Sequence, residues 1–263
     1  MKRTFTKTVL MHYFKLVFRS ALFLTATGIY VYNRIRGNDD TFSSVEKEHA
    51  ILIGIWVFFF VGMVMRLFPA GLESMGCQKQ FRKNYLEAPG CHEITVKRKS
   101  KGVFLTFSSW ILLNGAIGGL YIAGVIDKGI LFLISLAYSV CDVICILFFC
   151  PFQTWFMKNK CCTTCRIYNW DYAMMFTPLV FIPNVYTWTL LGMALVLLVR
   201  WEYVFFRYPE RFSEKCNRSL SCAMCKEKLC LHKKQLQGFL MKGRFDLSGN
   251  AIIKTIRGKR KKE

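Results

Sequence analysis

Apolar runs of membrane length recur along the chain, and they constrain its fold more than any other feature. A run of about 20 apolar residues spans the hydrocarbon core of a bilayer as an α-helix, which satisfies its own backbone hydrogen bonds. We therefore expect an all-α integral membrane protein in which residues 1–206 form a bundle of about six transmembrane helices. The predicted spans are residues 13–33, 50–68, 103–125, 130–155, 172–183 and 185–206.

Composition favours a membrane protein over a nucleic-acid-binding one. Hydrophobic residues make up 53% of the 263 residues, and the 24 phenylalanines exceed what one soluble core of this size would bury. The net charge of +21 is accompanied by no zinc-finger, helix-turn-helix or RNA-binding pattern. Because the basic stretches flank the apolar runs, we expect contact with anionic lipid headgroups and no nucleic acid.

The fifth span is the least regular. Apolar sequence continues from Tyr172 to Phe206, too long for one crossing, and it is divided by Pro178, Pro183 and Asn184. Either a short fifth helix crosses and the chain makes six crossings, or this piece is re-entrant and five helices cross. The second alternative would put the C-terminal tail on the side opposite the N-terminus.

The distribution of charge favours six crossings. Loop 71–102 is strongly basic, whereas loop 34–49 mixes basic and acidic residues. The positive-inside rule therefore places the N-terminus and loop 71–102 in the cytoplasm. Residues 207–263 form a basic, Cys-rich tail, and an even number of crossings returns it to the same side. We predict a multi-pass protein of the cell (inner) membrane with both termini cytoplasmic.

Most of the 12 cysteines lie in basic loops on the predicted cytoplasmic side, where thiols stay reduced. Two CxxC pairs have the spacing of zinc and iron–sulfur sites, and neighbouring Lys and Arg side chains favour the thiolate that binds metal. We therefore predict a cytoplasmic-face site for an iron–sulfur cluster or zinc. Its predicted ligands are Cys161, Cys162, Cys165, Cys216, Cys222, Cys225 and Cys230.

Several arrangements of these cysteines stay open. The two clusters could share one four-cysteine site assembled across the last two helices, or each could form its own site, with His232 as a substitute ligand. The same ligands suit zinc bound only for folding. Thiols that bind no metal are a further alternative, and disulfides rank last unless the topology is inverted.

The fourth span carries a second group of candidate residues. Cys141 and Cys145 share one helix face, and Asp142 lies about 60° from Cys145. In a continuous helix Cys150 would lie nearly opposite Cys141. An aspartate at membrane depth is costly and usually functional, which predicts a transport or relay role for this group. Alternatively, the cysteines only pack, and Asp142 bonds to Asn114 or to a hydroxyl of a neighbouring helix.

The leading functional prediction is a membrane-anchored metal-cluster protein that passes electrons to a redox partner protein or senses redox state. The chain carries no nucleotide-binding, hydrolase or metalloprotease motif. Although Cys150-Pro151 is similar to a dipeptide in the conduction helix of cation pumps, we expect no pump, because no nucleotide-binding domain accompanies it. The alternatives are a soft-metal transporter that uses Cys141, Asp142 and Cys145, and a membrane scaffold with structural zinc.

Overall fold

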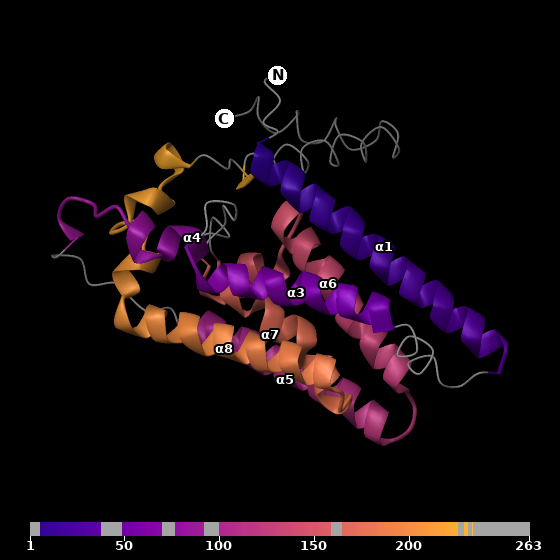
Figure 1. The fold of residues 1–263 in the computed structure, drawn as a ribbon. Helices are drawn as coiled ribbons and strands as arrows, with labels where there is room; N and C mark the ends of the chain where they lie inside the picture. The colour runs from indigo at the N-terminus through magenta and orange to yellow at the C-terminus, as the bar shows by residue number, and fades with distance from the viewer. Residues whose placement is uncertain are drawn as a thin grey trace, which may run out of the picture.

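The chain folds into a bundle of helices (Figure 1). The computed structural model describes residues 6–37, 49–69, 77–91, 100–158, 165–225, 229–230 and 233. Within these ranges every regular element is a helix, and only an isolated antiparallel bridge, between Glu87 and Asn217, pairs two extended backbones. The predicted all-α class is confirmed for this part of the chain.

Four helices are long and apolar enough to cross a membrane, as expected for a multi-pass protein. They are α1 (Lys7–Ile35), α5 (Ser100–Ile122), α6 (Lys128–Leu147) and α8 (Val185–Arg207). The apolar helix α3 (His49–Leu67) is shorter in its described part. Large apolar side chains cover the outside of the bundle, among them Leu10 of α1 and Phe104 and Leu112 of α5. Such a surface is suited to lipid rather than water.

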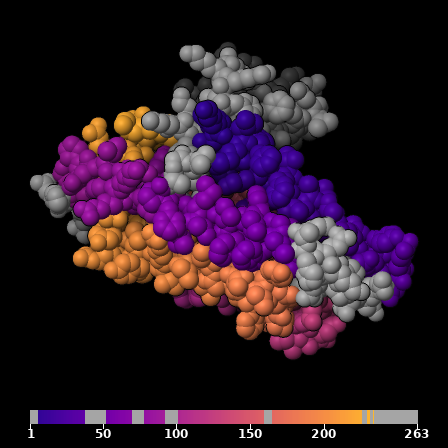
Figure 2. Space-filling model, viewed as in Figure 1, coloured from indigo at the N-terminus to yellow at the C-terminus, as the bar shows by residue number. Residues whose placement is uncertain are grey.

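The helices pack in pairs, α1 along α6 and α3 along α8 (Figure 1). Figure 2 shows the side chains of α3 and α8 in contact along their length. The Tyr30 hydroxyl near the end of α1 donates to Asp127 at 2.9 Å, and Asp127 caps the start of α6. These two helices are therefore antiparallel. Trp56 of α3 donates to Thr189 of α8 at 2.9 Å near the start of both helices, which makes that pair parallel.

The fourth predicted span is too long, because α6 ends at Leu147 rather than near residue 155. Proline disfavours helical backbone at the residue before it and supplies no N–H, so the sequence around Cys150 and Pro151 cannot continue a regular helix. A π-helical turn, Phe152–Phe156, follows the break. The chain therefore turns at Cys150 and does not continue along the axis of α6.

The fifth predicted span is the centre of the core. It consists of a six-residue helix, α7 (Asp171–Phe176), and a 3-10 turn, Thr177–Phe181. Its buried side chains, including Met175 and Phe176, pack among Phe59 and Met63 of α3, Leu131 of α6 and Leu190 and Leu197 of α8. The expected break is therefore present. Asn184 then caps α8 in a reciprocal capping box with Thr187.

A compact cap lies at the end of the bundle where α3 and α8 finish. It joins α4 (Cys77–Gln80) and the segment up to Cys91 to residues 209–225. The side chain of Asn217 is fully buried and donates to the carbonyls of Lys79 at 3.0 Å and Arg211 at 2.9 Å. A disulfide joins Cys91 to Cys216, with the Cα atoms 4.9 Å apart.

Disulfides were the least expected alternative for these cysteines unless the topology is inverted, and Cys91 and Cys216 form one. Cys216, predicted as a metal ligand, offers no thiolate while it is bonded to Cys91. The physical reason is the bridge between Glu87 and Asn217, which brings two loops far apart in sequence side by side.

Candidate functional site

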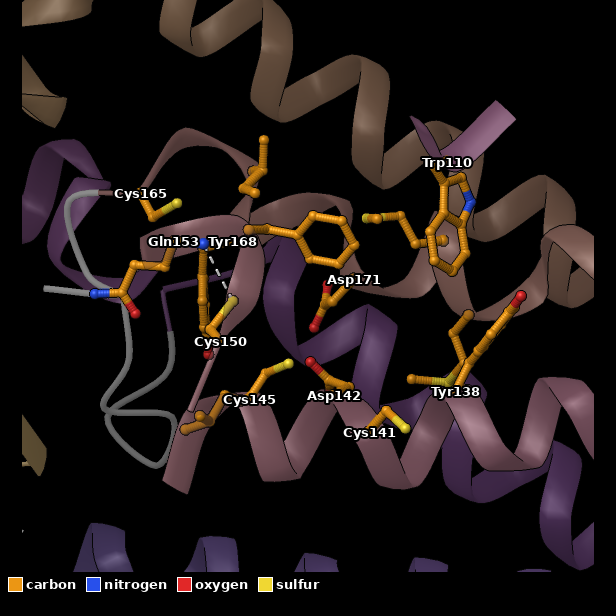
Figure 3. Close-up of a pocket in the computed structure, with 15 residues that line it drawn as sticks. Trp110, Tyr138, Cys141, Asp142, Cys145, Cys150, Gln153, Cys165, Tyr168 and Asp171 are labelled. Carbon is orange, nitrogen blue, oxygen red and sulfur yellow. Dashed lines mark hydrogen bonds between the residues drawn. The ribbon is translucent and has the colours of Figure 1, made fainter. Parts of the chain in front are cut away.

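A cavity of about 130 Å³ lies beside the C-terminal end of α6, between that helix, α5 and α7 (Figure 3). Four cysteines, two aspartates and several aromatic side chains line it. The four thiols belong to Cys141, Cys145, Cys150 and Cys165. All four residues predicted for transport or relay, Cys141, Asp142, Cys145 and Cys150, therefore line the cavity. One predicted metal ligand, Cys165, lines it as well.

Cys150 reaches the cavity because α6 stops before it. In a continuous helix its side chain would point nearly opposite to Cys141. After the break, the Cys145 and Cys150 side chains both line the cavity. The backbone N–H of Gln153 donates a hydrogen bond to the Cys150 sulfur at 3.4 Å. The expectation that Cys150 faces away from Cys141 was wrong.

The surroundings of Cys150, which lies beyond the end of α6, favour its thiolate. The neighbouring Cys145 thiol lowers the pKa of the Cys150 thiol, and the hydrogen bond from the Gln153 backbone N–H lowers it further. Burial acts in the opposite direction and is outweighed.

Cys141, one of the residues that line the cavity, is exposed on the side of α6, one helical turn before Cys145. Ile144 of the same helix is about two-fifths exposed. Among the four thiols of the cavity, that of Cys141 is therefore the exposed one.

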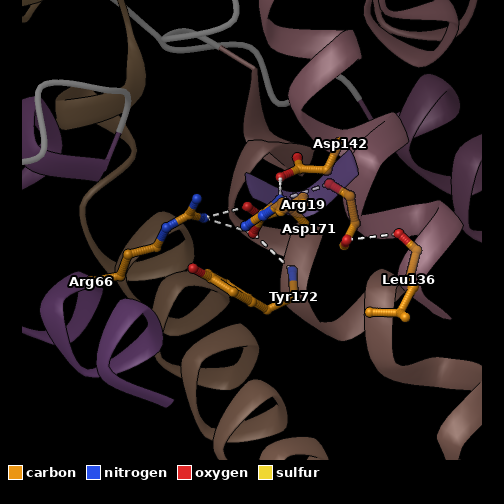
Figure 4. A network of polar contacts seen from close by, with 7 residues as sticks. Arg19, Arg66, Leu136, Asp142, Asp171 and Tyr172 are labelled. Carbon is orange, nitrogen blue, oxygen red and sulfur yellow. Dashed lines mark hydrogen bonds and ion pairs between the residues drawn. The ribbon is translucent and has the colours of Figure 1, made fainter. Parts of the chain in front are cut away.

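The two aspartates of the cavity are each paired with an arginine from another helix (Figure 4). Arg19 of α1 donates to Asp142 at 2.9 Å and to the carbonyl of Ser139 at 2.8 Å. Arg66 of α3 donates to Asp171 at 2.7 Å, and Asp171 also accepts from the backbone N–H of Tyr172. Both carboxylates are thus neutralised by charge of the opposite sign.

Arg19 is the residue that the sequence analysis did not connect to the site. The alternative partners expected for Asp142 were Asn114 or a hydroxyl, yet the side-chain amide of Asn114 donates to the Trp110 carbonyl of its own helix. The available signal was one arginine in the first predicted span and one aspartate in the fourth. Opposite charges at membrane depth are expected to pair.

The segment after Cys165 is anchored separately. Arg166 forms an ion pair with Glu202 of α8, and the indole N–H of Trp170 donates to the same carboxylate at 2.7 Å. The side-chain amide of Asn169 donates to Gln80 of α4 at 3.2 Å. These contacts fix the segment that carries Cys165 into the cavity.

The predicted metal ligands are divided between two places. Cys165 lines the cavity, whereas Cys222 and Cys225 lie at the cap, where the ammonium of Lys79 approaches the Cys225 sulfur at 3.9 Å. Cys161 and Cys162 lie outside the described residues, and Cys230 is not in the cavity wall. Among the described residues, no three Cys, His, Asp or Glu side chains are grouped as a metal site would require.

Comparisons of the chain with protein-family models, curated proteins and solved structures gave no match.

Proposed function

We propose that this is a multi-pass membrane protein in which Cys145 and Cys150 cycle between two thiols and one disulfide. The observation that carries the proposal is that the thiols of Cys145 and Cys150 line the same cavity, at the point where α6 ends. On oxidation both S–H bonds break, one S–S bond forms, and two electrons and two protons pass to an acceptor. The proposal retains the electron-transfer or redox-sensing role that the sequence predicts. Two thiols, and not a metal, perform that role.

The two cysteines have different roles in this cycle. Cys150 attacks the acceptor, because the hydrogen bond from the Gln153 backbone N–H stabilises its thiolate. Cys145 then closes the disulfide. The broken end of α6 supports this step, since Cys150 belongs to a non-helical turn that can adjust while Cys145 is fixed on a helix.

The test is direct oxidation of the purified protein. After reduction, the wild-type chain is treated with diamide, a small neutral thiol oxidant, and its disulfides are mapped by mass spectrometry. We expect a Cys145–Cys150 disulfide in the wild type and in the control variant Cys222→Ser, and none in Cys145→Ser or Cys150→Ser. If the wild-type pair stays reduced while other thiols are oxidised, the proposal is wrong.

Soft-metal transport is the second candidate. It is favoured by one observation, that Cys141, Asp142 and Cys145 all line one cavity. It is disfavoured by the pairing of Asp142 with Arg19, which occupies the carboxylate that an ion would need. Asp142→Asn distinguishes the two functions: it should abolish metal uptake by a transporter and leave the diamide-induced disulfide unchanged in a thiol redox protein.

The proposed topology has six crossings with both termini in the cytoplasm. It is supported by charge and by the alternating helix directions, with α7 and its 3-10 turn as the short fifth crossing. The Cys91–Cys216 disulfide favours the inverted orientation, with the cap outside the cytoplasm, because cytoplasmic disulfides are rare. We give charge more weight, since a reducing compartment can open the disulfide without changing the fold of the spans.

Labelling tests the orientation. Cys222 is exposed at the cap and reports the side on which the cap lies. A maleimide that cannot cross membranes should leave Cys222 unlabelled in intact cells and label it after lysis. Labelling in intact cells would establish the inverted orientation.

A further inference from the structure

The size of the cavity limits what can react with its thiols. A volume of about 130 Å³ is close to the ~150 Å³ that accommodates benzene in an engineered cavity of another protein. It therefore admits one six-membered ring and not a folded protein loop. A partner protein would have to expose the thiols by a large rearrangement, whereas a small ring reaches them in the observed geometry.

The walls suit an aromatic or quinoid ring. The Trp110 ring lies 4.8 Å from the Tyr138 ring and 6.4 Å from the Phe152 ring, measured between centroids, and all three residues line the cavity. Flat rings at these separations offer stacking and edge contacts to a further ring.

The route into the cavity selects for a lipid-soluble molecule. Cys141 lines the cavity and is exposed on the side of a helix long and apolar enough to cross a membrane, where Ile144 is also exposed. A charged or strongly hydrated oxidant would lose its hydration to enter there. A molecule already dissolved in the bilayer pays no such cost.

We propose that the cavity binds the ring of a lipid-soluble quinone, which oxidises the Cys145 and Cys150 thiols. This inference rests on the proposed thiol redox function and names its substrate class. The reaction balances as one quinone and two thiols giving one quinol and one disulfide. Both S–H bonds break, the two hydrogens are added to the quinone oxygens, and two electrons pass from sulfur to the ring. In the reverse direction a quinol reduces the disulfide.

The test uses the full-length protein in lipid nanodiscs. The protein is reduced, freed of reductant under anaerobic conditions and mixed with a short-chain benzoquinone or naphthoquinone. Ultraviolet absorbance measures the loss of quinone, and mass spectrometry measures the disulfide. We expect one quinone consumed for each Cys145–Cys150 disulfide formed, at a rate at least tenfold above that of Cys145→Ser or Cys150→Ser.

A variant at Cys141 tests the route. Cys141→Trp should slow the quinone reaction at least tenfold by obstructing the cavity at this residue. The control, Val199→Trp, adds a Trp side chain at an exposed position of α8 that does not line the cavity, and it should react within about twofold of the wild type. Entry at Cys141 would be contradicted if both variants reacted equally slowly, or if neither reacted more slowly than the wild type.

Failure of the quinone assignment is distinguishable from failure of the redox function. If diamide forms the disulfide but quinones react at the rate of the serine variants, the quinone assignment is overturned and the redox function stands. If neither oxidant forms it, both are overturned. A quinone covalently attached to a cysteine, with no disulfide, also overturns the assignment, because addition and not electron transfer has then occurred.

Discussion

Replacing Arg19 by methionine should destabilise the protein more than any other loss of a single charge in α1. Arg19 is 3% exposed, and the Asp142 side chain is 16% exposed. Two unit charges 2.9 Å apart attract by about 6 kcal/mol at an effective dielectric constant of about 20, and the cost of burying them offsets part of this. Removing only the arginine leaves a buried, uncompensated carboxylate. We therefore expect Arg19→Met to lower the free energy of unfolding by about 3–5 kcal/mol.

Thermal unfolding in detergent, followed by intrinsic tryptophan fluorescence, measures this loss. A loss of about 4 kcal/mol corresponds to a fall in Tm of roughly 8–16 °C for a chain of this size. The control is Arg34→Met, because Arg34 lies 4.0 Å from Asp127 at the exposed end of the same helix, where such pairs are worth about 1 kcal/mol or less.

A double variant completes the reasoning. Arg19→Met combined with Asp142→Leu replaces both charges by apolar groups and should recover most of the lost stability. A stabilising role of the buried Arg19–Asp142 pair is refuted if Arg19→Met costs no more stability than Arg34→Met. It is also refuted if the double variant loses the sum of the two single losses, because the charges would then not interact.

Three further predictions concern packing, the cap and the reactive thiol. Gly118→Ala should cost about 1–3 kcal/mol in thermal unfolding, because its Cβ would overlap the Phe181 ring, whereas Gly119→Ala, with open space around it, should cost nothing measurable. Cys216→Ser should lower stability by up to about 5 kcal/mol, since its disulfide joins residues 125 positions apart; a reducing agent should have the same effect on the wild type and none on the variant. Alkylation of Cys150 should be half-maximal below the ordinary thiol pKa of about 8.5, because the thiolate is favoured; a profile centred at or above pH 8.5 would contradict the assigned hydrogen bond from the Gln153 N–H.

The positions of most helices could be predicted because hydrophobic length is a local property of the sequence. Runs 13–33 and 185–206 lie within α1 and α8, and the break at Pro178 falls inside the 3-10 turn that follows α7. The fourth run, predicted to residue 155, extends past α6, which ends at Leu147, just before Cys150-Pro151. There, the apolar sequence continued past the point where proline prevents the backbone from remaining helical.

The candidate site could be predicted only in part. The face shared by Cys141 and Cys145 follows from helical periodicity, and both line the cavity. The approach of Cys150 depends on the turn after α6, and Cys165 enters from a segment held by Arg166 and Glu202. Neither approach is encoded in residue spacing, so a prediction based on CxxC pairs assigned Cys165 to a metal site.

By itself the sequence determined that this chain forms apolar helices, because a run of apolar side chains long enough to cross a bilayer has to satisfy its backbone hydrogen bonds within the helix. It also placed thiols and one aspartate on the fourth run. Only the tertiary structure decided which groups meet: Arg19 with Asp142, Cys91 with Cys216, and Cys145 with Cys150. The first two pairings join segments more than a hundred residues apart, and the third depends on the direction in which the chain turns. The long-range pairings and the direction of the turn are set by the packing of helices against one another. No local sequence pattern specifies that packing.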